Sequence, residues 1–593
     1  MIYRCLCLTK MRQTKPSGLS QNALFILQQR YLQRDENREI IETPTQMFKR
    51  VAKAIAEIEF TYKKDKIFVK KLEKDFFNMI MRMEFLPNSP TLMNAGTKLG
   101  QLSACFVLPV EDDIDSIFNA VHYTAKIHQS GGGTGFSFSR LRPKGDIVKS
   151  TGGIASGPLS FMQVFNSATD VIKQGGKRRG ANMGILRVDH PDIEDFIITK
   201  EKEGIFANFN FSVGITDKFI DAVVKDIDFE LINPRTKKPM KTIKARVIWN
   251  LLCYMSWKNG EPAVIFLDTI NKSNPTPEIG ELEATNPCGE TPLLPYESCN
   301  LGSINLSKFV KKNGSVKIDY EKLRKTVRLA IRFLDDVIDT NKYPLPEIKE
   351  ATLANRKIGL GVMGFADMLL YLGVKYNSNR ALEIAEDVMK VILEEATKAS
   401  EELGKERGNF PNKDKSIYKS SPFMRNATLT TIAPTGTISI IANCSFGIEP
   451  IFAIVQRRNV KETLGKDLIE VNPAVKRSLE LKGLWNPEIE KTLATTQCKN
   501  CVVLPKEMRE ALVTSAEISP EGHLKMQAAF QKYTHNAVSK TINLPNTTTV
   551  NDIEQIYLLA HKLGIKGVTI YRDGSRNYQL LTKEDGSCPV CPS

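Results

Sequence analysis

The feature that most constrains the fold is an alternation of three kinds of segment from residue 86 to about residue 576. Glycine-rich turns, short apolar runs and longer helical stretches follow one another through this part of the 593-residue chain. The run CFVLPV, which starts at Cys105, and the run AVIFLD, which starts at Ala263, have the length and composition of buried strands. Apolar residues from Leu323 to Ile338 recur at helical spacing. This alternation favours an α/β architecture with a mainly parallel sheet or barrel.

The two ends of the chain differ from this middle part. Residues 1–85 are predicted to be helical, with a helix over residues 43–60 that Thr43 caps and Pro44 opens. Residues 577–593 are short and polar and contain a cysteine pair, which is typical of a mobile tail. We therefore expect three parts: a helical domain over 1–85, an α/β domain over 86–576 and a tail over 577–593.

Composition narrows the function classes. Hydrophobic residues make up 42% and charged residues 25%, which is ordinary for a soluble globular protein. Apolar runs stay shorter than the roughly 18 residues that span a bilayer, and the N-terminus lacks a secretory signal, so we expect a cytoplasmic protein. The net charge of +15 favours anionic partners. Because the basic residues are spread along the chain, a phosphorylated small molecule is favoured over nucleic acid.

Eleven cysteines without a signal peptide indicate reduced, catalytic thiols rather than a disulfide framework. Asn286, Cys288 and Glu290 alternate in the segment NPCGE, so an extended or looped backbone would place their side chains on one side. A thiol flanked by an amide and a carboxylate suits radical chemistry on a sugar: the sulfur takes a hydrogen atom, the carboxylate takes a hydroxyl proton and the amide holds a neighbouring hydroxyl. The alternative is a structural loop in which Cys288 is inert.

The other cysteines are ambiguous when taken singly. Cys105 and Cys299 each fit a buried core position, and spacing does not show that they meet. Cys588 and Cys591 form a C-x-x-C pair that could exchange electrons with a disulfide or bind zinc. Cys498 and Cys501 form a second such pair, too far from the first for the usual zinc-ribbon spacing.

Three glycine-containing segments, residues 131–135, 174–180 and 434–438, could hold phosphates through backbone N–H groups, or be structural turns. Gly359 to Gly364 matches G-x-G-x-x-G, but a basic segment, Asn355 to Lys357, precedes it where a dinucleotide site needs an apolar strand, so we reject that interpretation. The six histidines show no metal-ligand spacing, so no protein-built metal centre is expected.

Eight motifs in order carry a resemblance to a known family: LPNSPTLMNAG, SACFVLP, SGGGTGFSFSRLRP, GGKRRGANMG, NPCGE, SCNLGSINL, APTGTIS and KGVTIYRDGSR. Together they resemble the catalytic chain of ribonucleotide reductases, most closely the dimeric class that depends on adenosylcobalamin. The resemblance runs from about Leu19 to the C-terminus. It implies a ten-stranded α/β barrel with a finger loop that bears the radical cysteine, preceded by a small helical domain.

The resemblance also implies roles for single residues. Cys288 matches the radical thiol, while Asn286 and Glu290 occupy the positions that bind and deprotonate the substrate ribose hydroxyl. Cys105 and Cys299 match the thiols that reduce the 2′-carbon, and the tail residues Cys588 and Cys591 match the pair that re-reduces them. The implied substrate site, phosphate contacts included, adds Ser89, Ala104, Gly133, Pro434, Thr435, Gly436, Thr437 and Ile438.

Regulation is implied at two further places. Asp112, Ser116, Arg142 and Lys149 fall where the family binds a deoxynucleoside triphosphate effector at a helical dimer interface. The loop that relays effector identity to substrate choice matches Gln174, Gly175, Gly176, Lys177, Arg178, Arg179, Gly180, Ala181, Asn182 and Met183. The chain begins almost directly at the helical domain, so we expect no ATP/dATP on-off control by an N-terminal cone.

The expected protein is therefore an oxidoreductase that makes deoxyribonucleotides, with adenosylcobalamin as cofactor and ribonucleoside diphosphates as substrates, although the sequence does not separate diphosphates from triphosphates. We see no paired-tyrosine relay near the C-terminus, which favours cobalamin. The expected partners are deoxynucleoside triphosphate effectors, a thioredoxin-like reductant and a second copy of the chain, with no membrane and no nucleic acid. Two alternatives stay open: a reductase subunit that receives its radical from a di-metal partner or a glycyl radical, and a basic zinc-binding nucleic-acid module.

Overall fold

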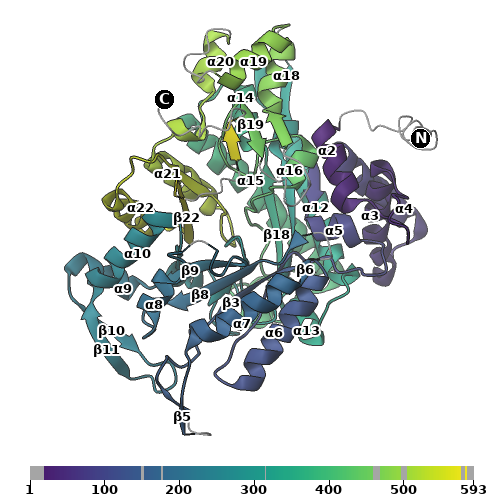
Figure 1. Ribbon diagram of the computed structural model, residues 1–593. Helices are drawn as coiled ribbons and strands as arrows, with labels where there is room; N and C mark the ends of the chain where they lie inside the picture. Colours follow the sequence, from purple (N-terminus) through teal and green to yellow (C-terminus); the bar gives the residue numbers. More distant parts are fainter. Residues whose placement is uncertain are drawn as a thin grey trace.

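The computed structural model describes residues 19–148, 152–174, 178–202, 204–313, 315–458, 468–481, 483–495, 504–575 and 581–583. N-terminal helices lie at one side of a large α/β body, and a small helical group lies above it (Figure 1). The first group comprises α2 (Gln21–Ile26), α3 (Pro44–Ala56), α4 (Lys66–Met81) and α5 (Ser89–Asn94). The second comprises α18 (Pro473–Leu481), α19 (Pro487–Thr495) and α20 (Lys506–Ala511). Among the described helices none is long and apolar enough to cross a membrane.

The predicted N-terminal helix is confirmed in its start and its buried face. Thr43 and Gln46 form a reciprocal capping box at the first turn of α3. Met47, Val51 and Ile55 are buried against the core. The α-helix ends at Ala56, and a 3₁₀ turn, η3 (Glu57–Tyr62), continues it through the rest of the predicted range.

The central sheet has ten strands. Nine of them run in the order β1 (Phe85–Pro87), β15 (Ser298–Asn305), β2 (Cys105–Val107), β3 (Gly133–Ser137), β8 (Asn182–Arg187), β9 (Phe209–Ile215), β12 (Ala263–Phe266), β22 (Gly567–Arg572) and β21 (Thr541–Leu544). The tenth, β18 (Ile358–Met363), pairs with β15. The runs predicted as strands at Cys105 and Ala263 are therefore confirmed.

Most neighbouring strands are parallel. The five strands from β2 to β12 are parallel throughout, as are the pairs β15/β18 and β21/β22. Antiparallel pairing joins these groups at β15/β2 and at β12/β22. Single parallel bridges, Leu360 to Thr430 and Ile432 to Val538, then connect β18 to the segment before β21. The sheet thereby closes on itself as the expected α/β barrel.

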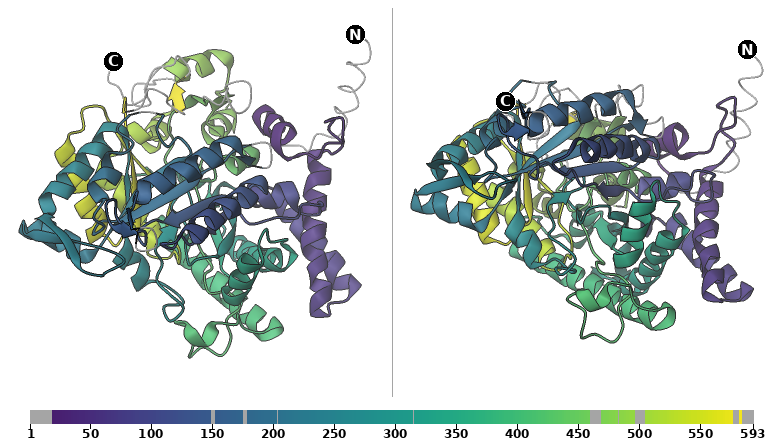
Figure 2. Two further views of the ribbon diagram at one scale, coloured as in Figure 1. Left: turned by 60° about the horizontal axis from the view of Figure 1, so that its bottom comes forward. Right: turned by 90° about the horizontal axis from the view of Figure 1, so that it is seen from below.

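Helices surround the barrel (Figure 2). The longest are α15 (Asn379–Arg407) and α12 (Tyr320–Thr340), and α12 covers the helix predicted from Leu323 to Ile338. Two further helices, α6 (Ile114–Gln129) and α7 (Pro158–Val171), pack side by side. The rest include α8 (Ile193–Ile198), α9 (Asp217–Lys225), α10 (Ala245–Asn259), α11 (Leu267–Lys272), α13 (Pro346–Asn355), α14 (Phe365–Leu372), α16 (Ile438–Ala442), α21 (Pro520–Gln531) and α22 (Val550–Lys562).

A cluster of buried charges, the junction cluster, joins the helical domain to the barrel side. Arg407 donates to Glu59 at 2.5 Å, to Asp336 at 2.7 Å and to Asp335 at 2.9 Å, and all four side chains are fully buried. Arg356 adds an ion pair of 2.8 Å to Asp335. Because Glu59 lies in η3 and the two aspartates in α12, the cluster ties elements of the two parts together.

Candidate functional site

The segment that carries Cys288 forms a hairpin between β12 and β15, which we call the finger. Its stem pairs β13 (Ala284–Thr285) with β14 (Pro292–Leu293), and residues 286–291 form its tip. Gly289 has a φ of +80°, and its N–H donates to the carbonyl of Asn286 at 3.0 Å. The left-handed backbone at Gly289 turns the chain sharply.

The three polar residues of the tip differ in exposure. Asn286 and Glu290 are buried, whereas Cys288 is exposed. Negative charge at either Cys288 or Glu290 raises the pKa of Cys105, so both side chains lie near that thiol. That Asn286, Cys288 and Glu290 share one side of the chain stays a prediction.

The finger lies inside the barrel, because strands from different sides hold its tip. From β9, Asn210 Nδ2 donates to the carbonyl of Pro287 at 2.7 Å. From the other side, Ala537 N and Thr431 Oγ1 donate to the carbonyl of Glu290 at 2.9 and 2.7 Å. One backbone donor and two side-chain donors thus hold the carbonyl groups of the tip.

The glycines among residues 131–135, which lead into β3 and form its start, make room for the finger and for the neighbouring strand β2. A Cβ on Gly135 would lie 1.7 Å from the carbonyl oxygen of Thr285 in the finger stem. A Cβ on Gly132 would lie 2.4 Å from the ring of Phe106 in β2. Of the two interpretations left open for residues 131–135, the structural one accounts for these two glycines.

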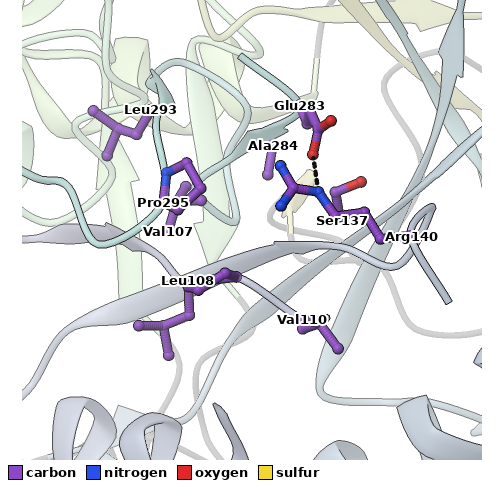
Figure 3. A pocket seen from close by; sticks show the side chains of 10 residues that line it. Val107, Leu108, Val110, Ser137, Arg140, Glu283, Ala284, Leu293 and Pro295 are labelled. Atoms are coloured by element: carbon purple, nitrogen blue, oxygen red, sulfur yellow. Dashed lines mark hydrogen bonds and ion pairs between the residues drawn. The ribbon is translucent and has the colours of Figure 1, made fainter. Parts of the chain in front are cut away.

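The root of the finger is clamped from outside (Figure 3). Arg140 Nε donates to Glu283 Oε2 at 3.0 Å, one residue before the stem, and Arg140 also pairs with Glu111. Figure 3 shows this contact beside a small pocket that Val107 of β2 and the following Leu108 share with Ala284 and Leu293 of the stem.

Two cysteines from distant parts of the chain meet beside the finger. In the antiparallel pairing of β2 with β15, Cys105 lies directly opposite Cys299. Both are buried, at 4% and 0% exposure. The finger reaches this pair, because Asn286 Nδ2 donates to Cys105 Sγ at 3.2 Å and Thr291 Oγ1 lies 3.9 Å from the same sulfur.

Burial keeps these thiols protonated. Desolvation raises the pKa of Cys105, and negative charge at Glu290, Cys299 and Cys288 raises it further. Desolvation likewise raises the pKa of Cys299. At neutral pH both groups are therefore S–H groups, the form that can give up hydrogen.

Glu290 is a buried carboxyl whose second oxygen is left open. Its side chain is 3% exposed, and Oε2 has no hydrogen-bond partner among the described residues. Burial raises the pKa of Glu290 to about 7, and hydrogen bonding with Asn286 opposes the rise. A carboxyl with this pKa can take up or release a proton near neutral pH.

The remaining expected substrate residues come from three parts of the chain. Ala104 N donates to the carbonyl of Cys299 at 3.2 Å, and Gly133 N donates to the carbonyl of Ala104 at 3.0 Å, so these residues adjoin the cysteine pair. Ser89 opens α5, where its hydroxyl bonds to the hydroxyl of Tyr31 at 2.7 Å.

Residues 434–438 follow the strand segment that holds Glu290. Thr435 adopts a φ of +57°, and its hydroxyl accepts from Gly447 N at 2.8 Å. This strained turn leads into the first turn of α16, where Ser439 N donates to the carbonyl of Thr435 at 2.9 Å. The structure thus brings the segment APTGTIS next to the finger through chain continuity from Thr431.

Of the expected effector residues, the structure describes Asp112, Ser116 and Arg142. Arg142 Nε donates to Asp112 Oδ2 at 2.8 Å, and Arg142 N donates to Asp112 Oδ1 at 3.0 Å. Ser116 lies in the first turn of α6, and its hydroxyl accepts from Glu111 N at 3.1 Å. Lys149 lies outside the described residues, as do Cys498, Cys501, Cys588 and Cys591.

The expected specificity loop is described except for Gly175 to Lys177. Its two sides pair as β6 (Lys173–Gln174) and β7 (Arg178–Arg179), and its last two residues, Asn182 and Met183, begin β8. Gly180 packs against two elements at once: a Cβ there would lie 2.5 Å from Thr169 in α7 and 2.8 Å from His128 in α6. The loop is thus anchored to the helices that follow the effector residues.

Sequence reasoning did not identify two features of this region. One is Thr291, which bonds through its N–H to Asn286 Oδ1 at 3.0 Å and helps to hold that amide. The other is a buried ion pair between Glu297 and Lys357. Its only sequence signal was a basic residue, Lys357, directly before the apolar strand IGLGVM. This strand is β18, in which Gly359 and Gly361 pack closely against Thr431.

The described residues contain no cluster of three or more histidine, cysteine, aspartate or glutamate side chains that could hold a metal ion.

Comparisons with known proteins identify the family of the two domains. The family model for the ribonucleotide reductase barrel domain matches residues 103–423 and 423–571, and the model for the all-alpha domain matches residues 17–100. A vitamin B12-dependent ribonucleoside-diphosphate reductase of Thermoplasma acidophilum is 50% identical over 95% of this chain and 80% of its own length. One of Mycobacterium tuberculosis is 46% identical over 95% of this chain and 81% of its own length.

A solved structure supports the fold. The alpha subunit of a class Id ribonucleotide reductase from Actinobacillus ureae superposes with a TM-score of 0.76, covering 95% of this chain and 99% of that chain at 23% identity. The family models together cover nearly the whole chain, and the relatives cover it at high identity. The chain therefore belongs to the ribonucleotide reductase family.

Proposed function

We propose that this chain reduces ribonucleoside diphosphates to deoxyribonucleoside diphosphates by thiyl-radical chemistry, with adenosylcobalamin as the radical source. The observation that carries the proposal is the placement of Cys288 on a finger inside the barrel, beside the facing thiols of Cys105 and Cys299. The names of the relatives at 50% and 46% identity support the substrate and the cofactor. Family membership removes the nucleic-acid module as an alternative.

The cofactor fits the exposure of the finger tip. Cys288 is exposed, whereas Cys105 and Cys299 are buried, so a bulky radical donor can approach the first thiol and not the other two. When bound, adenosylcobalamin supplies the radical that turns the Cys288 thiol into a thiyl radical.

The finger residues then act on the ribose. The Cys288 sulfur takes the 3′-hydrogen, and the Glu290 carboxylate takes the proton of the 3′-hydroxyl through its open Oε2. The amide of Asn286 holds the neighbouring hydroxyl. Because the pKa of Glu290 is about 7, the carboxylate form needed for this step prevails above that pH.

The cysteine pair supplies the reduction. The 2′-hydroxyl leaves as water, Cys105 and Cys299 together give two hydrogens, and Cys288 returns the 3′-hydrogen. One ribonucleotide and one dithiol thus become one deoxyribonucleotide, one disulfide and one water. Residues directly opposite in an antiparallel pair have Cα atoms roughly 4.5–5.5 Å apart, within the span that a disulfide bridges, so the barrel need not open.

We assign the outlying residues by the same proposal. The substrate phosphates bind at Pro434 to Ile438, with Ser89, Ala104 and Gly133 lining the site. The tail residues Cys588 and Cys591 re-reduce the disulfide and receive electrons from a thioredoxin-like protein in the cytoplasm. We divide the chain at the expected bounds, with the catalytic barrel over 86–576 between a helical domain and a redox tail.

We further propose a homodimer that binds its effector at α6. Helix α6 exposes apolar side chains one turn apart: Ile114 and Phe118 are 57% and 50% exposed. Adjacent exposed apolar side chains of this kind are typical of a protein interface. A deoxynucleoside triphosphate at Asp112, Ser116, Arg142 and Lys149 would lie beside them, and the loop from Gln174 to Met183 would relay its identity.

The test is an assay of each ribonucleotide with the purified chain and a dithiol, with and without adenosylcobalamin, adding one effector at a time. The proposal expects deoxyribonucleoside diphosphates only when the cofactor is present, with a substrate preference that changes with the effector. Activity that needs a di-metal partner chain or a glycyl radical, and ignores adenosylcobalamin, would establish the alternative instead.

A further inference from the structure

A charged pair lies buried at the base of β15. Lys357 Nζ donates to Glu297 Oε2 at 2.6 Å, and each side chain is 2% exposed. Glu297 is fully engaged: Oε2 also accepts from Leu294 N at 2.7 Å, and Oε1 accepts from Asn355 Nδ2 at 2.5 Å. The pair therefore has one fixed geometry.

Strand register places this pair beside the cysteines. In the parallel pairing of β15 with β18, Asn300 lies opposite Ile358. The residues that precede these two, Cys299 in β15 and Lys357 just before β18, therefore lie opposite each other. Asn300 points outward, where its Nδ2 donates to the carbonyl of Leu334 in α12 at 2.8 Å. Because successive side chains alternate, Cys299, Lys357 and Glu297 share the inward face.

The position of the pair calls for an explanation beyond stability. A buried ion pair pays a large desolvation cost, and apolar residues of the same volume stabilise a fold equally well or better. The apolar cluster inside the barrel, which includes Cys105, Val107 and Cys299, would accept such residues. The charge of Lys357 lowers the pKa of Cys299, against the larger rise caused by burial, and Glu297 opposes it.

We propose that Lys357 is a positioning residue for regeneration of the cysteine pair: its ammonium, held by Glu297, stabilises the Cys299 thiolate that leaves when the Cys105–Cys299 disulfide is opened. The inference rests on the proposed function, in which this disulfide forms at each turnover. It deepens that function by assigning different roles to the two sulfurs.

Exposure decides which sulfur is attacked. Cys105 is 4% exposed and Cys299 is fully buried, and the finger reaches Cys105. One thiolate of the incoming dithiol bonds to the Cys105 sulfur, and the Cys105–Cys299 bond breaks with its electron pair on Cys299. The second thiolate of the dithiol then displaces Cys105. The two protons of the dithiol end on Cys105 and Cys299, and the dithiol leaves as a disulfide.

The rate at which the Cys105–Cys299 disulfide opens depends on the pKa of the sulfur that leaves. A sulfur with a lower pKa leaves faster in thiol–disulfide exchange. Without the neighbouring ammonium, the buried Cys299 thiolate would have to form with no charge partner, which slows the opening step. The forward chemistry on the ribose starts from the neutral thiols and does not require this charge.

The test measures re-reduction without any nucleotide or cofactor. The purified chain is oxidised with diamide, mixed with dithiothreitol and quenched at intervals, and free thiol at Cys105 and Cys299 is counted by isotope-coded alkylation and peptide mass spectrometry. We expect the neutral double variant Glu297→Gln, Lys357→Met to re-reduce about tenfold more slowly than the unaltered chain. Lys357→Gln, which keeps a donor for Glu297, is expected to show the same slowing.

Two variants separate the charge from the fold. Lys357→Arg keeps the charge and is expected to stay within about twofold of the unaltered rate. The control Glu42→Gln, Arg50→Met, which removes a mostly buried pair of 2.7 Å in the helical domain, is expected to do the same. The proposal is overturned if both neutral variants re-reduce at the unaltered rate, if Lys357→Arg is as slow as they are, or if the control slows equally. Failure of the cobalamin assay with intact disulfide kinetics would instead overturn the proposed function.

Discussion

Two regions of the molecule bury charge in opposite ways. At the junction cluster, the fully buried Arg407 faces Glu59, Asp335 and Asp336 at 2.5 to 2.9 Å. At the finger, the buried Glu290 has no basic partner among the described residues and keeps one oxygen open. The junction cluster pairs opposite charges, whereas the finger holds a carboxyl without a basic partner.

The pKa values follow this difference at Asp335 and Glu290, although burial raises the pKa of Asp336 in the same cluster against the opposing charge of Arg407. Burial raises the pKa of Asp335, but Arg356, Arg425 and Arg407 outweigh burial and hold it well below its usual range. Burial raises the pKa of Glu290 to about 7, and only hydrogen bonds, from the Asn286 amide and from the backbone of Glu290, oppose the rise. Paired charge fixes a domain junction, whereas an open carboxyl costs stability and is available for chemistry. Glu290 differs from the carboxyls of the junction cluster in having no arginine partner among the described residues.

The largest effect is expected when the buried carboxyl of the finger, Glu290, is replaced. Glu290→Gln removes the proton acceptor but keeps the shape, and we expect turnover to fall by about a hundredfold or more. In the unaltered chain, kcat/KM should rise as pH increases through about 7, because the carboxylate must be ionised to act. Steady-state assays from pH 5.5 to 8.5 measure both; turnover of the variant within threefold would contradict this role.

The same variant is also expected to change the free energy of unfolding, in a direction that the raised pKa of Glu290 fixes. Since the folded pKa of about 7 lies above the ordinary value of 4.5, ionisation of Glu290 destabilises the fold at pH 8 and has no effect at pH 4. Glu290→Gln should therefore raise the free energy of unfolding by up to about 3 kcal/mol at pH 8 and leave it unchanged at pH 4. Denaturant unfolding at the two pH values decides the point.

A second prediction concerns how the buried Cys105–Cys299 disulfide is reduced again. The double variant Cys588→Ser, Cys591→Ser should form about one deoxynucleotide per site and then stall, because the buried disulfide is left oxidised. Addition of a small dithiol should restore turnover. Product counting per active site with thioredoxin as the only reductant measures this, and sustained turnover there would remove the tail from the mechanism.

The junction cluster predicts a loss of stability without a loss of chemistry. Asp335→Asn leaves Arg356, Arg407 and Arg425 short of one negative charge, and we expect the free energy of unfolding to fall by about 3–5 kcal/mol. Product formed in one turnover per folded molecule should stay unchanged. A variant with normal stability, or one that folds normally yet forms no product, would erase the distinction between the two regions.

The smallest effect is expected at the root of the finger. Arg140 is 41% exposed, and its ion pairs to Glu283 and Glu111 are screened by solvent. Arg140→Gln should therefore change the free energy of unfolding by less than about 1 kcal/mol. A larger loss, measured by denaturant unfolding in low and high salt, would show that the finger depends on this outer clamp.

The sequence predicted the α/β class with a mainly parallel sheet or barrel, because hydrophobic periodicity is a local property. The chemistry assigned to NPCGE stays a prediction. The sequence did not predict from spacing that Cys105 and Cys299 meet, since their pairing depends on an antiparallel contact between β2 and β15, far apart in the chain. The ordered family motifs supplied that pairing instead.

Two further features depend on three-dimensional context. The alternation of Asn286, Cys288 and Glu290 did not predict that Cys288 would be exposed while the other two are buried, because the turn at Gly289 interrupts the strand period. Lys357 looked like part of a basic segment, although its side chain is buried beside Cys299. The burial of Lys357 depends on where β18 packs and on its ion pair with Glu297, and neither is visible as a local pattern.

The most direct test of the central claim is product formation by Cys288→Ser. With adenosylcobalamin, a dithiol and each ribonucleoside diphosphate, this variant is predicted to form no deoxynucleotide, even in a single turnover, while nucleotide binding stays within about threefold because the hydroxyl preserves the finger. The unaltered chain should form product under the same conditions. Comparable product from the variant would contradict the assignment of Cys288 as the radical thiol.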